Sequence, residues 1–399
     1  MASSQHSHQE LKMTQFNPPK NLNVMAFGFL FVGLITFILG FIKNPDRMWA
    51  SYLTAFFYFA CLGVGAMFFI AFNYAAKAGW SASIRRFAEA MTSYIPVMLV
   101  TTFVLFLGFK KLYVWSDPAQ LAALGGGKLT YLNPTFVAVR LILFGLGCLV
   151  FRSLIVGNSI KQDKTGEHAL TYKNLTYSIG FIAFFAIFFT LFSFDLMMSL
   201  LPTWYSTIFG IYCFAGAIQS TMAVLAIMIV WLKKSPWLSG YVTEEHQHDV
   251  GKFLKGFTIF WAYIAFSQFM LIWYANIPEE TEFYIIRSLN GWMAVSFSLL
   301  IFRFIIPFLV LLPRGAKRND TVLVSISILV LVMQYVDLYW LVYPNFFDGI
   351  PQFGFWEIGI FLGFFGLFLM TMIQFLKKNN LVAIKDPRLH EALKHHVSY

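Results

Sequence analysis

The sequence predicts an all-α polytopic membrane protein with ten transmembrane helices. Hydrophobic residues fill 58% of the 399 positions and charged residues only 12%, about half the charged share typical of soluble proteins. Ten apolar stretches each have the ~20 residues that a helix needs to cross a hydrocarbon core ~30 Å thick. No stretch alternates polar and apolar residues with period two, as strands of a membrane barrel do, so helices are the predicted class.

The apolar stretches follow one another through polar connections and give the expected spans in order. These spans are 22–42, 49–76, 91–112, 133–156, 172–200, 204–232, 251–276, 284–312, 321–343 and 354–376. Two connections, 201–203 and 277–283, are so short that they must join antiparallel neighbours, which is the arrangement found in helical bundles.

Charged residues inside the spans indicate two similar groups of four helices. Spans two to five and six to nine run in the same directions, and the third helix of each group carries an arginine, Arg140 or Arg303. The fourth helix carries an aspartate, Asp195 or Asp337. We therefore expect two four-helix bundles plus two flanking helices. The expected segments are an N-terminal tail at 1–21, flanking helix 1 at 22–48, a first bundle at 49–200, a second bundle at 201–343, flanking helix 10 at 344–376 and a C-terminal tail at 377–399.

The net charge of +10 is explained by membrane topology rather than by a nucleic-acid partner. Most Lys and Arg residues fall in the tails and in the even-numbered connections, which is the bias that cytoplasmic segments show. The opposite side holds only Lys43, Arg47, Lys110, Lys111, Lys128 and Arg287. We therefore expect both termini to be cytoplasmic. The first 21 residues are polar and the first apolar run is too long for the core of a signal peptide, so no cleaved segment is expected.

Histidine and cysteine placement predicts that this chain binds no haem, iron–sulfur cluster, flavin or metal. The eight histidines lie in predicted tails or connections, so no pair inside the spans can hold a b-type haem. Cys61, Cys148 and Cys213 stand alone in separate spans, without the spacing of a zinc or iron–sulfur site. We assign no catalytic residue.

Polar residues in the second group of spans suggest a proton path. A charge inside a bilayer costs at least ~2.5–3.5 kcal/mol, so each one needs a structural or functional reason. Arg303 is expected roughly 10 Å from the height of Asp337 at 1.5 Å per residue, so a direct bond needs side-chain reach or a bridging water. The alternative is a set of hydrogen bonds that only join helices. The proton-path candidates are Asp337, Gln334, Arg303 and Gln268 within spans, with His248 and Asp249 at the cytoplasmic mouth.

The first group of spans offers a different polar pair. Arg140 and Asp195 lie near the outer ends of neighbouring antiparallel spans, so an ion pair between them is feasible. The functional interpretation of this pair is a proton-exchanging carboxylate beside a polar cavity, and Asn73 in span two is a further polar residue within a span. The alternative is a structural ion pair that locks two helices.

Four segments resemble a known family. They are Phe194 to Gly210 (FDLMMSLLPTWYSTIFG), Phe260 to Gln268 (FWAYIAFSQ), Leu271 to Thr281 (LIWYANIPEET) and Asp337 to Trp340 (DLYW). This chain resembles the polysulfide-reductase/NrfD-like membrane subunits of alternative complex III, in particular the subunit type called ActF, from about span two to span nine. The resemblance implies ten spans in two four-helix bundles with two flanking helices.

The resemblance further implies a quinol:electron-acceptor oxidoreductase in the bacterial inner membrane. Its expected partners are an NrfD-like quinol-oxidising subunit called ActC, an iron–sulfur subunit, a multihaem cytochrome c, membrane lipids and a terminal oxidase. Haem and iron–sulfur centres are then expected on those partners, while quinol remains an open ligand for this chain. Three functions stay open: a scaffold with a proton-conducting path, a subunit that itself binds quinol around Asp195 and Arg140, with Asn73 as a third quinone-binding candidate, and a secondary transporter.

Overall fold

The computed structural model describes residues 16–235, 238, 240–347 and 349–396, and this part of the chain is helical without strands. Within it, ten helical segments are long and apolar enough to cross a membrane. They are α1 (Lys20–Lys43), α2 (Pro45–Ala75), α3 with η2 and α4 (Arg85–Met91, Thr92–Tyr94 and Ile95–Leu107), α8 (Pro134–Thr165), α9 with η4 (Ala169–Leu196 and Met198–Leu200), α10 (Phe209–Lys233), α11 (Glu244–Ala275), α13 with η5 and α14 (Trp292–Ser298, Leu299–Ile305 and Ile306–Val310), α16 with η6 (Asp320–Val342 and Tyr343–Asn345) and α17 (Phe355–Lys378).

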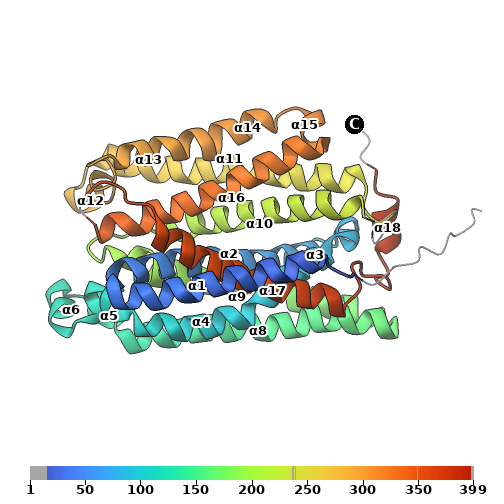
Figure 1. The fold of residues 1–399 in the computed structure, drawn as a ribbon, viewed down its shortest axis with the longest axis horizontal. Helices are drawn as coiled ribbons and strands as arrows, with labels where there is room; N and C mark the ends of the chain where they lie inside the picture. The colour runs from blue at the N-terminus through green and yellow to red at the C-terminus, as the bar shows by residue number, and fades with distance from the viewer. Residues whose placement is uncertain (1–15, 236–237, 239, 348, 397–399) are drawn as a thin grey trace, which may run out of the picture.

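Short helices fill the connections. On the side of the molecule where α1 begins and α17 ends, which we call the terminal face, these are η1 (Gly79–Ser83), α15 (Arg314–Arg318) and α18 (Leu389–Leu393). On the other side, called the opposite face, they are α5 (Phe109–Leu112), η3 (Val114–Ser116), α6 (Pro118–Leu124), α7 (Lys128–Tyr131) and α12 (Pro278–Ile285). Figure 1 shows the terminal face on the right and the opposite face on the left.

Local sequence signals explain where several spans begin and end. The pairs Asn44-Pro45 and Asn133-Pro134 start α2 and α8, because the asparagine side chain accepts hydrogen bonds from the first free amides and proline tolerates the first helical position. Asn319 caps α16 in the same way. Gly166 ends α8 in a left-handed conformation with φ of 74°.

Packing confirms the predicted two bundles and the flanking pair. The first bundle contains α2, α3–α4, α8 and α9, and the second contains α10, α11, α13–η5–α14 and α16. The flanking helices α1 and α17 pack mainly on each other, and α17 also contacts α2. Their backbones meet at Gly33 and Gly363, where a Cβ added to Gly363 would lie 2.8 Å from the Cα of Gly33. Small residues permit such close approach in membrane helices.

Several expected spans have different bounds in the structure, among them the fourth, which ends at Thr165 rather than 156. The third begins at Arg85 rather than 91 and the seventh at Glu244 rather than 251, because their first turns are polar and lie beyond the apolar stretch. The eighth begins at Trp292 rather than 284, since α12 and a turn at the opposite face use residues 278–291. The first turns of α3 and α11, whose residues are buried near the terminal face, were therefore wrongly expected to be connections.

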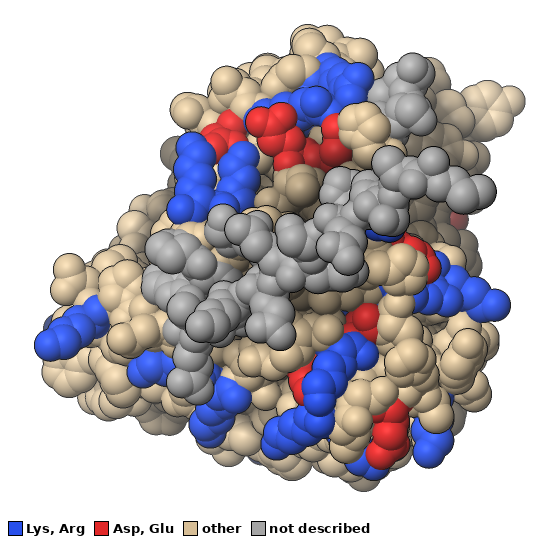
Figure 2. All heavy atoms as spheres, turned by 90° about the vertical axis from the view of Figure 1, so that its right-hand side faces the viewer, with Lys and Arg blue, Asp and Glu red and all other residues tan. Residues whose placement is uncertain are grey.

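The segment after α17 crosses the terminal face from the first bundle to the second. Asn380 donates to Asp163 of α8 at 3.3 Å, and Asp386 pairs with Arg85 of α3. His395 then contacts Asp249 of α11, with 2.5 Å between Nε2 and Oδ2. Figure 2 views this face, where Lys and Arg side chains are spread around the rim with acidic side chains between them.

Candidate functional site

The second bundle encloses a buried polar network around Arg303. Its guanidinium Nη1 lies 2.6 Å from Oδ2 of Asp337, its Nε donates to Oε1 of Gln219 at 3.2 Å, and its Nη2 donates to Gln334. The Tyr212 hydroxyl donates to the other carboxylate oxygen of Asp337. Each of these five side chains is at most 5% exposed, so the network is closed off from its surroundings.

All four helices of the second bundle contribute to this network. Tyr212 and Gln219 come from α10, Arg303 from η5, and Gln334 and Asp337 from α16. The fourth helix, α11, contributes Thr258, which accepts a hydrogen bond from Gln219 at 3.0 Å, and Trp261, whose ring lies 4.2 Å from the Arg303 guanidinium carbon. Gly216 of α10 makes room for the charged groups, because a Cβ there would lie 2.8 Å from Arg303 Nη2 and from Gln334 Oε1.

The backbone around Arg303 departs from α-helical geometry. Leu299–Ile305 form a π-helix, and Pro307 follows it. Proline has no amide hydrogen and cannot make the usual hydrogen bond to the carbonyl of residue 303, which favours a local change of helix type. The sequence could therefore have indicated an irregular helix at this position.

The direct contact between Arg303 and Asp337 corrects the expected separation of about 10 Å. The membrane segment begins at Trp292 and not at 284, which brings Arg303 nearer to the opposite face, and the long arginine side chain covers the remaining distance. Gln334 joins the network as expected. Gln268 makes its hydrogen bonds elsewhere: it accepts from Ser206 at 3.1 Å and donates to Tyr284 at 3.3 Å, near the opposite face.

The first bundle contains a simpler ion pair. Arg140 donates through Nε to Oδ2 of Asp195 at 2.8 Å and through Nη2 to Oδ1 at 2.7 Å, so both carboxylate oxygens are engaged. Nη2 also donates to the carbonyl of Tyr131 at 2.9 Å, and the rings of Tyr131 and Phe136 lie 4.2 and 4.4 Å from the guanidinium carbon. The expected pair is therefore present, and it is fully enclosed.

Asn73 does not belong to that site. It lines a cavity of about 180 Å³ near the terminal face together with Thr171 of α9, whereas Asp195 lies 24 positions further along α9, which is about 36 Å of helix. The cavity is also lined by Tyr74, Arg85 and Asp386. It is large enough for several water molecules, each of which occupies ~30 Å³ in the liquid.

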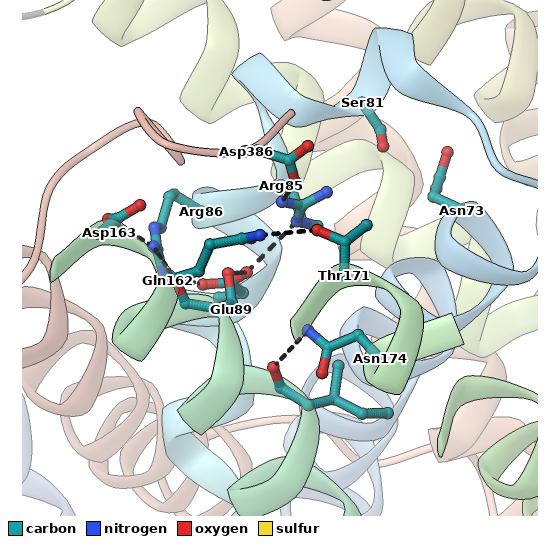
Figure 3. Close-up of polar contacts among 12 residues, drawn as sticks. Asn73, Ser81, Arg85, Arg86, Glu89, Gln162, Asp163, Thr171, Asn174 and Asp386 are labelled. Carbon is teal, nitrogen blue, oxygen red and sulfur yellow. Dashed lines mark hydrogen bonds and ion pairs between the residues drawn. The ribbon is translucent and has the colours of Figure 1, made fainter. Parts of the chain in front are cut away.

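A second charged cluster, missed by the sequence reasoning, lies beside this cavity (Figure 3). Glu89 of α3 is fully buried and contacts Arg86, while its Oε1 accepts a hydrogen bond from Ser159 at 2.7 Å. Arg86 also pairs with Asp163 of α8 at 2.6 Å, and Arg85 pairs with Asp386. The sequence feature that could have revealed this cluster is the spacing of Arg85, Arg86 and Glu89, which lets Glu89 contact both arginines on one helix.

His248 and Asp249 lie at the terminal face, in the first turns of α11. Asp249 contacts Lys252 at 2.6 Å as well as His395. Thr258 is nine positions further along α11, about 13 Å closer to Arg303. The structure therefore places these two candidates and the Arg303 network along one helix, with the apolar residues Val250 and Leu254 buried between them.

Within the charged cluster at the terminal face, the pKa of Asp386 is shifted. Burial alone would raise the pKa of this carboxyl, but the charge of Arg85 and hydrogen bonds from Arg85 and the Arg388 amide hold it below its usual value. Asp386 is therefore expected to keep its negative charge and its contact with Arg85 at neutral pH.

No protein-family model matches this sequence, and no curated protein is significantly similar to it.

Proposed function

We propose that this chain is an integral membrane subunit of a quinol:electron-acceptor oxidoreductase of the alternative complex III type, the ActF-like subunit that its sequence segments resemble. In that assembly it scaffolds the complex and conducts protons through its second bundle. The redox centres lie on partners: the NrfD-like quinol-oxidising subunit, the iron–sulfur subunit and the multihaem cytochrome c. A subunit of this kind would sit in the bacterial inner membrane with both termini in the cytoplasm.

The observation that carries the proton-conducting role is the network around Asp337. A scaffold needs only apolar contacts between helices, whereas buried charges in a membrane are costly and mark functional positions by default. Here a carboxylate that can change its protonation state touches an arginine and a tyrosine hydroxyl, and amides extend the chain of hydrogen bonds to Thr258. Such a connected set of donors and acceptors suits proton transfer.

The route between Asp337 and the terminal face would continue along α11. Asp249 and His395, which contact each other, carry protonatable side chains at that face. Water entering between Thr258 and Asp249 would have to complete the roughly 13 Å between them. In the first bundle, Glu89 and the polar cavity beside it offer a second protonatable group near the same face.

Direct quinol binding at Arg140 and Asp195 is less well supported. Both oxygens of Asp195 accept from Arg140, and the carboxylate is fully buried, so no acceptor faces a ligand. Asn73, the third candidate of that site, lines a cavity with Thr171, which is about 36 Å from Asp195 along α9. The geometry suits a structural lock between α8 and α9.

Purification from native membranes tests the assignment to a redox complex. A tagged chain extracted in mild detergent should bring haem-containing partners with it, and the preparation should oxidise a quinol. After dissociation from those partners the chain itself should show no haem, iron–sulfur or flavin absorbance. A chain that carries its own stoichiometric chromophore, or that is recovered without redox partners while catalysing solute exchange, contradicts the proposal.

A further inference from the structure

A long apolar groove runs along the seam between the two bundles. It has a volume of about 790 Å³ and lies between α10, α16 and α17, with α2 at its base. Phe353 and Glu357 lie at its end near the opposite face, and Trp231, Met372 and Leu376 at its end near the terminal face. In Figure 1, α16 and α17 lie close together on the left and diverge towards the right.

The walls of this seam groove are almost entirely hydrocarbon and aromatic. Phe361 contacts Tyr58 and Phe59 with ring centroids 5.2 and 5.1 Å apart, and Phe59 contacts Phe368 at 5.6 Å. These ring contacts give the groove a preformed wall. Apolar cavities do not hold water, so in a membrane the groove is expected to hold a hydrocarbon chain.

The length of the seam groove limits the kind of chain. From Glu357 to Leu376, α17 lines it over 19 positions, about 28 Å, which is nearly the whole hydrocarbon core of ~30 Å. An acyl chain of a phospholipid reaches only about half of that thickness, since each leaflet supplies half of the core. A polyprenyl chain of several units can follow the groove from end to end.

One polar group in the groove lacks a partner. Tyr335 is 8% exposed, and its hydroxyl has no hydrogen-bond partner among the described residues. It lies eight positions before Tyr343, about 12 Å along the helix from the opposite-face end of this span. Phe353, which is 58% exposed, covers the ring with centroids 6.1 Å apart. By contrast, the hydroxyl of Tyr58 already donates to the carbonyl of Leu331 at 3.1 Å.

We propose that the seam groove binds a polyprenyl lipid whose weakly polar head group makes a hydrogen bond with the hydroxyl of Tyr335. The prenyl chain extends from there towards Trp231 and Leu376. The side chain of Phe353 moves aside when the head group enters. This site is separate from the Arg303 network and does not depend on the proposed role in a quinol-oxidising complex.

Retention of a defined polyprenyl alcohol tests the proposal. The full chain, purified with its native partners, is incubated with solanesol, a polyprenyl alcohol of nine isoprene units, and with a phosphatidylglycerol that has two acyl chains. Bound lipid is then quantified by mass spectrometry after washing. Val332→Trp fills the groove, and Val150→Trp is its control, because the two valines are 53% and 55% exposed and both lie near the middle of a span. Thermal unfolding verifies that all variants are folded.

We expect wild type and Val150→Trp to retain about one solanesol per chain and Val332→Trp to lose at least tenfold in retention. Tyr335→Phe should weaken solanesol binding about fivefold, in line with one lost hydrogen bond, whereas Tyr58→Phe should leave it unchanged. Equal retention by all folded variants would overturn the site. So would a Val332→Trp variant that loses phosphatidylglycerol but keeps solanesol, since the groove would then hold acyl chains. Equal binding by Tyr335→Phe and wild type would overturn the placement of the head group.

Discussion

At the scale of single residues, each bundle is organised by one arginine and one aspartate. Arg140 pairs with Asp195 and Arg303 with Asp337, in each case joining the third and fourth helices of a bundle. The surroundings differ. Arg140 engages both oxygens of Asp195 and the carbonyl of Tyr131, whereas Arg303 contacts two amides besides Asp337, which also accepts from the Tyr212 hydroxyl. The first pair is suited to locking helices together, and we propose that the second passes protons to its neighbours.

Replacing Asp195 by asparagine should destabilise the protein strongly. The change leaves the Arg140 guanidinium buried without its counter-charge, and breaking a buried ion pair in this way costs about 3–5 kcal/mol. Thermal or chemical unfolding of the detergent-solubilised protein measures the loss. Asp46→Asn is the matched control, because Asp46 pairs with Lys111 at 3.1 Å and both side chains are more than half exposed, so its removal should change stability little. Similar stability losses for the two variants would show that the Arg140 pair is not a lock.

At the scale of elements, close backbone contacts and terminal contacts hold the flanking parts in place. α1 and α17 meet at glycines rather than at large side chains. The segment after α17 is attached by an ion pair to α3 and by the contact between His395 and Asp249 to α11, so it is attached to one helix of each bundle. These contacts explain how two peripheral elements are positioned without joining either bundle core.

Gly363→Leu should separate α1 from α17. Even a Cβ at this position would lie 2.8 Å from the Cα of Gly33, which is too close for any side chain. Overpacking of this kind typically costs about 1–3 kcal/mol. Gly28→Leu on α1 is the control, because a Cβ there meets nothing within 4 Å. A disulfide engineered between α1 and α17 should form efficiently in wild type and Gly28→Leu and poorly in Gly363→Leu; equal yields in all three would contradict the observed packing.

The attachment of the C-terminal segment should depend on pH through Asp386. When folding lowers the pKa of a carboxyl, the carboxylate stabilises the folded protein at pH values above the pKa of the unfolded chain, which is near 4 for Asp. This stabilisation is lost as the pH falls through the pKa of the folded protein. The protection of residues 380–396 against hydrogen exchange, expressed relative to the intrinsic exchange rate at each pH, should therefore be high at pH 7 and fall below about pH 4. Asp386→Asn should show faster exchange already at pH 7 and a weaker change in acid. Identical exchange profiles for both proteins would rule out this attachment.

At the scale of the whole molecule, the sequence was sufficient for the architecture but not for the contacts inside it. Hydropathy predicted ten spans because a membrane demands long apolar helices, and the matching positions of arginine and aspartate predicted the two bundles. Hydropathy missed the helical, buried positions of Glu89 and Arg86, because the polar first turns of α3 lie outside the apolar stretch. It also misplaced Arg303, since neither the start at Trp292 nor the π-helix can be read from hydropathy. The grouping of Asn73 with Asp195 was wrong because span membership alone does not give depth.

The orientation of the whole molecule can be tested with reporters. The bias of Lys and Arg predicts a cytoplasmic terminal face and an external opposite face. A reporter active only in the cytoplasm should therefore be active when fused at Tyr399 and inactive when inserted at Gly126, in the connection between α6 and α7. Activity at Gly126 would reverse the orientation and place Asp337 nearer the cytoplasm.

The proton-conducting role of the second bundle is tested most directly by proton translocation in vesicles that contain the assembled, quinol-oxidising complex. Asp337→Asn preserves the size and hydrogen-bonding capacity of the side chain at the centre of the Arg303 network but removes its titration. We expect the variant complex to assemble and oxidise quinol while moving clearly fewer protons per electron than wild type. Gln268→Glu, outside the network, should leave that ratio unchanged. A wild-type ratio in an intact Asp337→Asn complex would contradict the account, and a loss of assembly instead would identify Asp337 as a structural anchor.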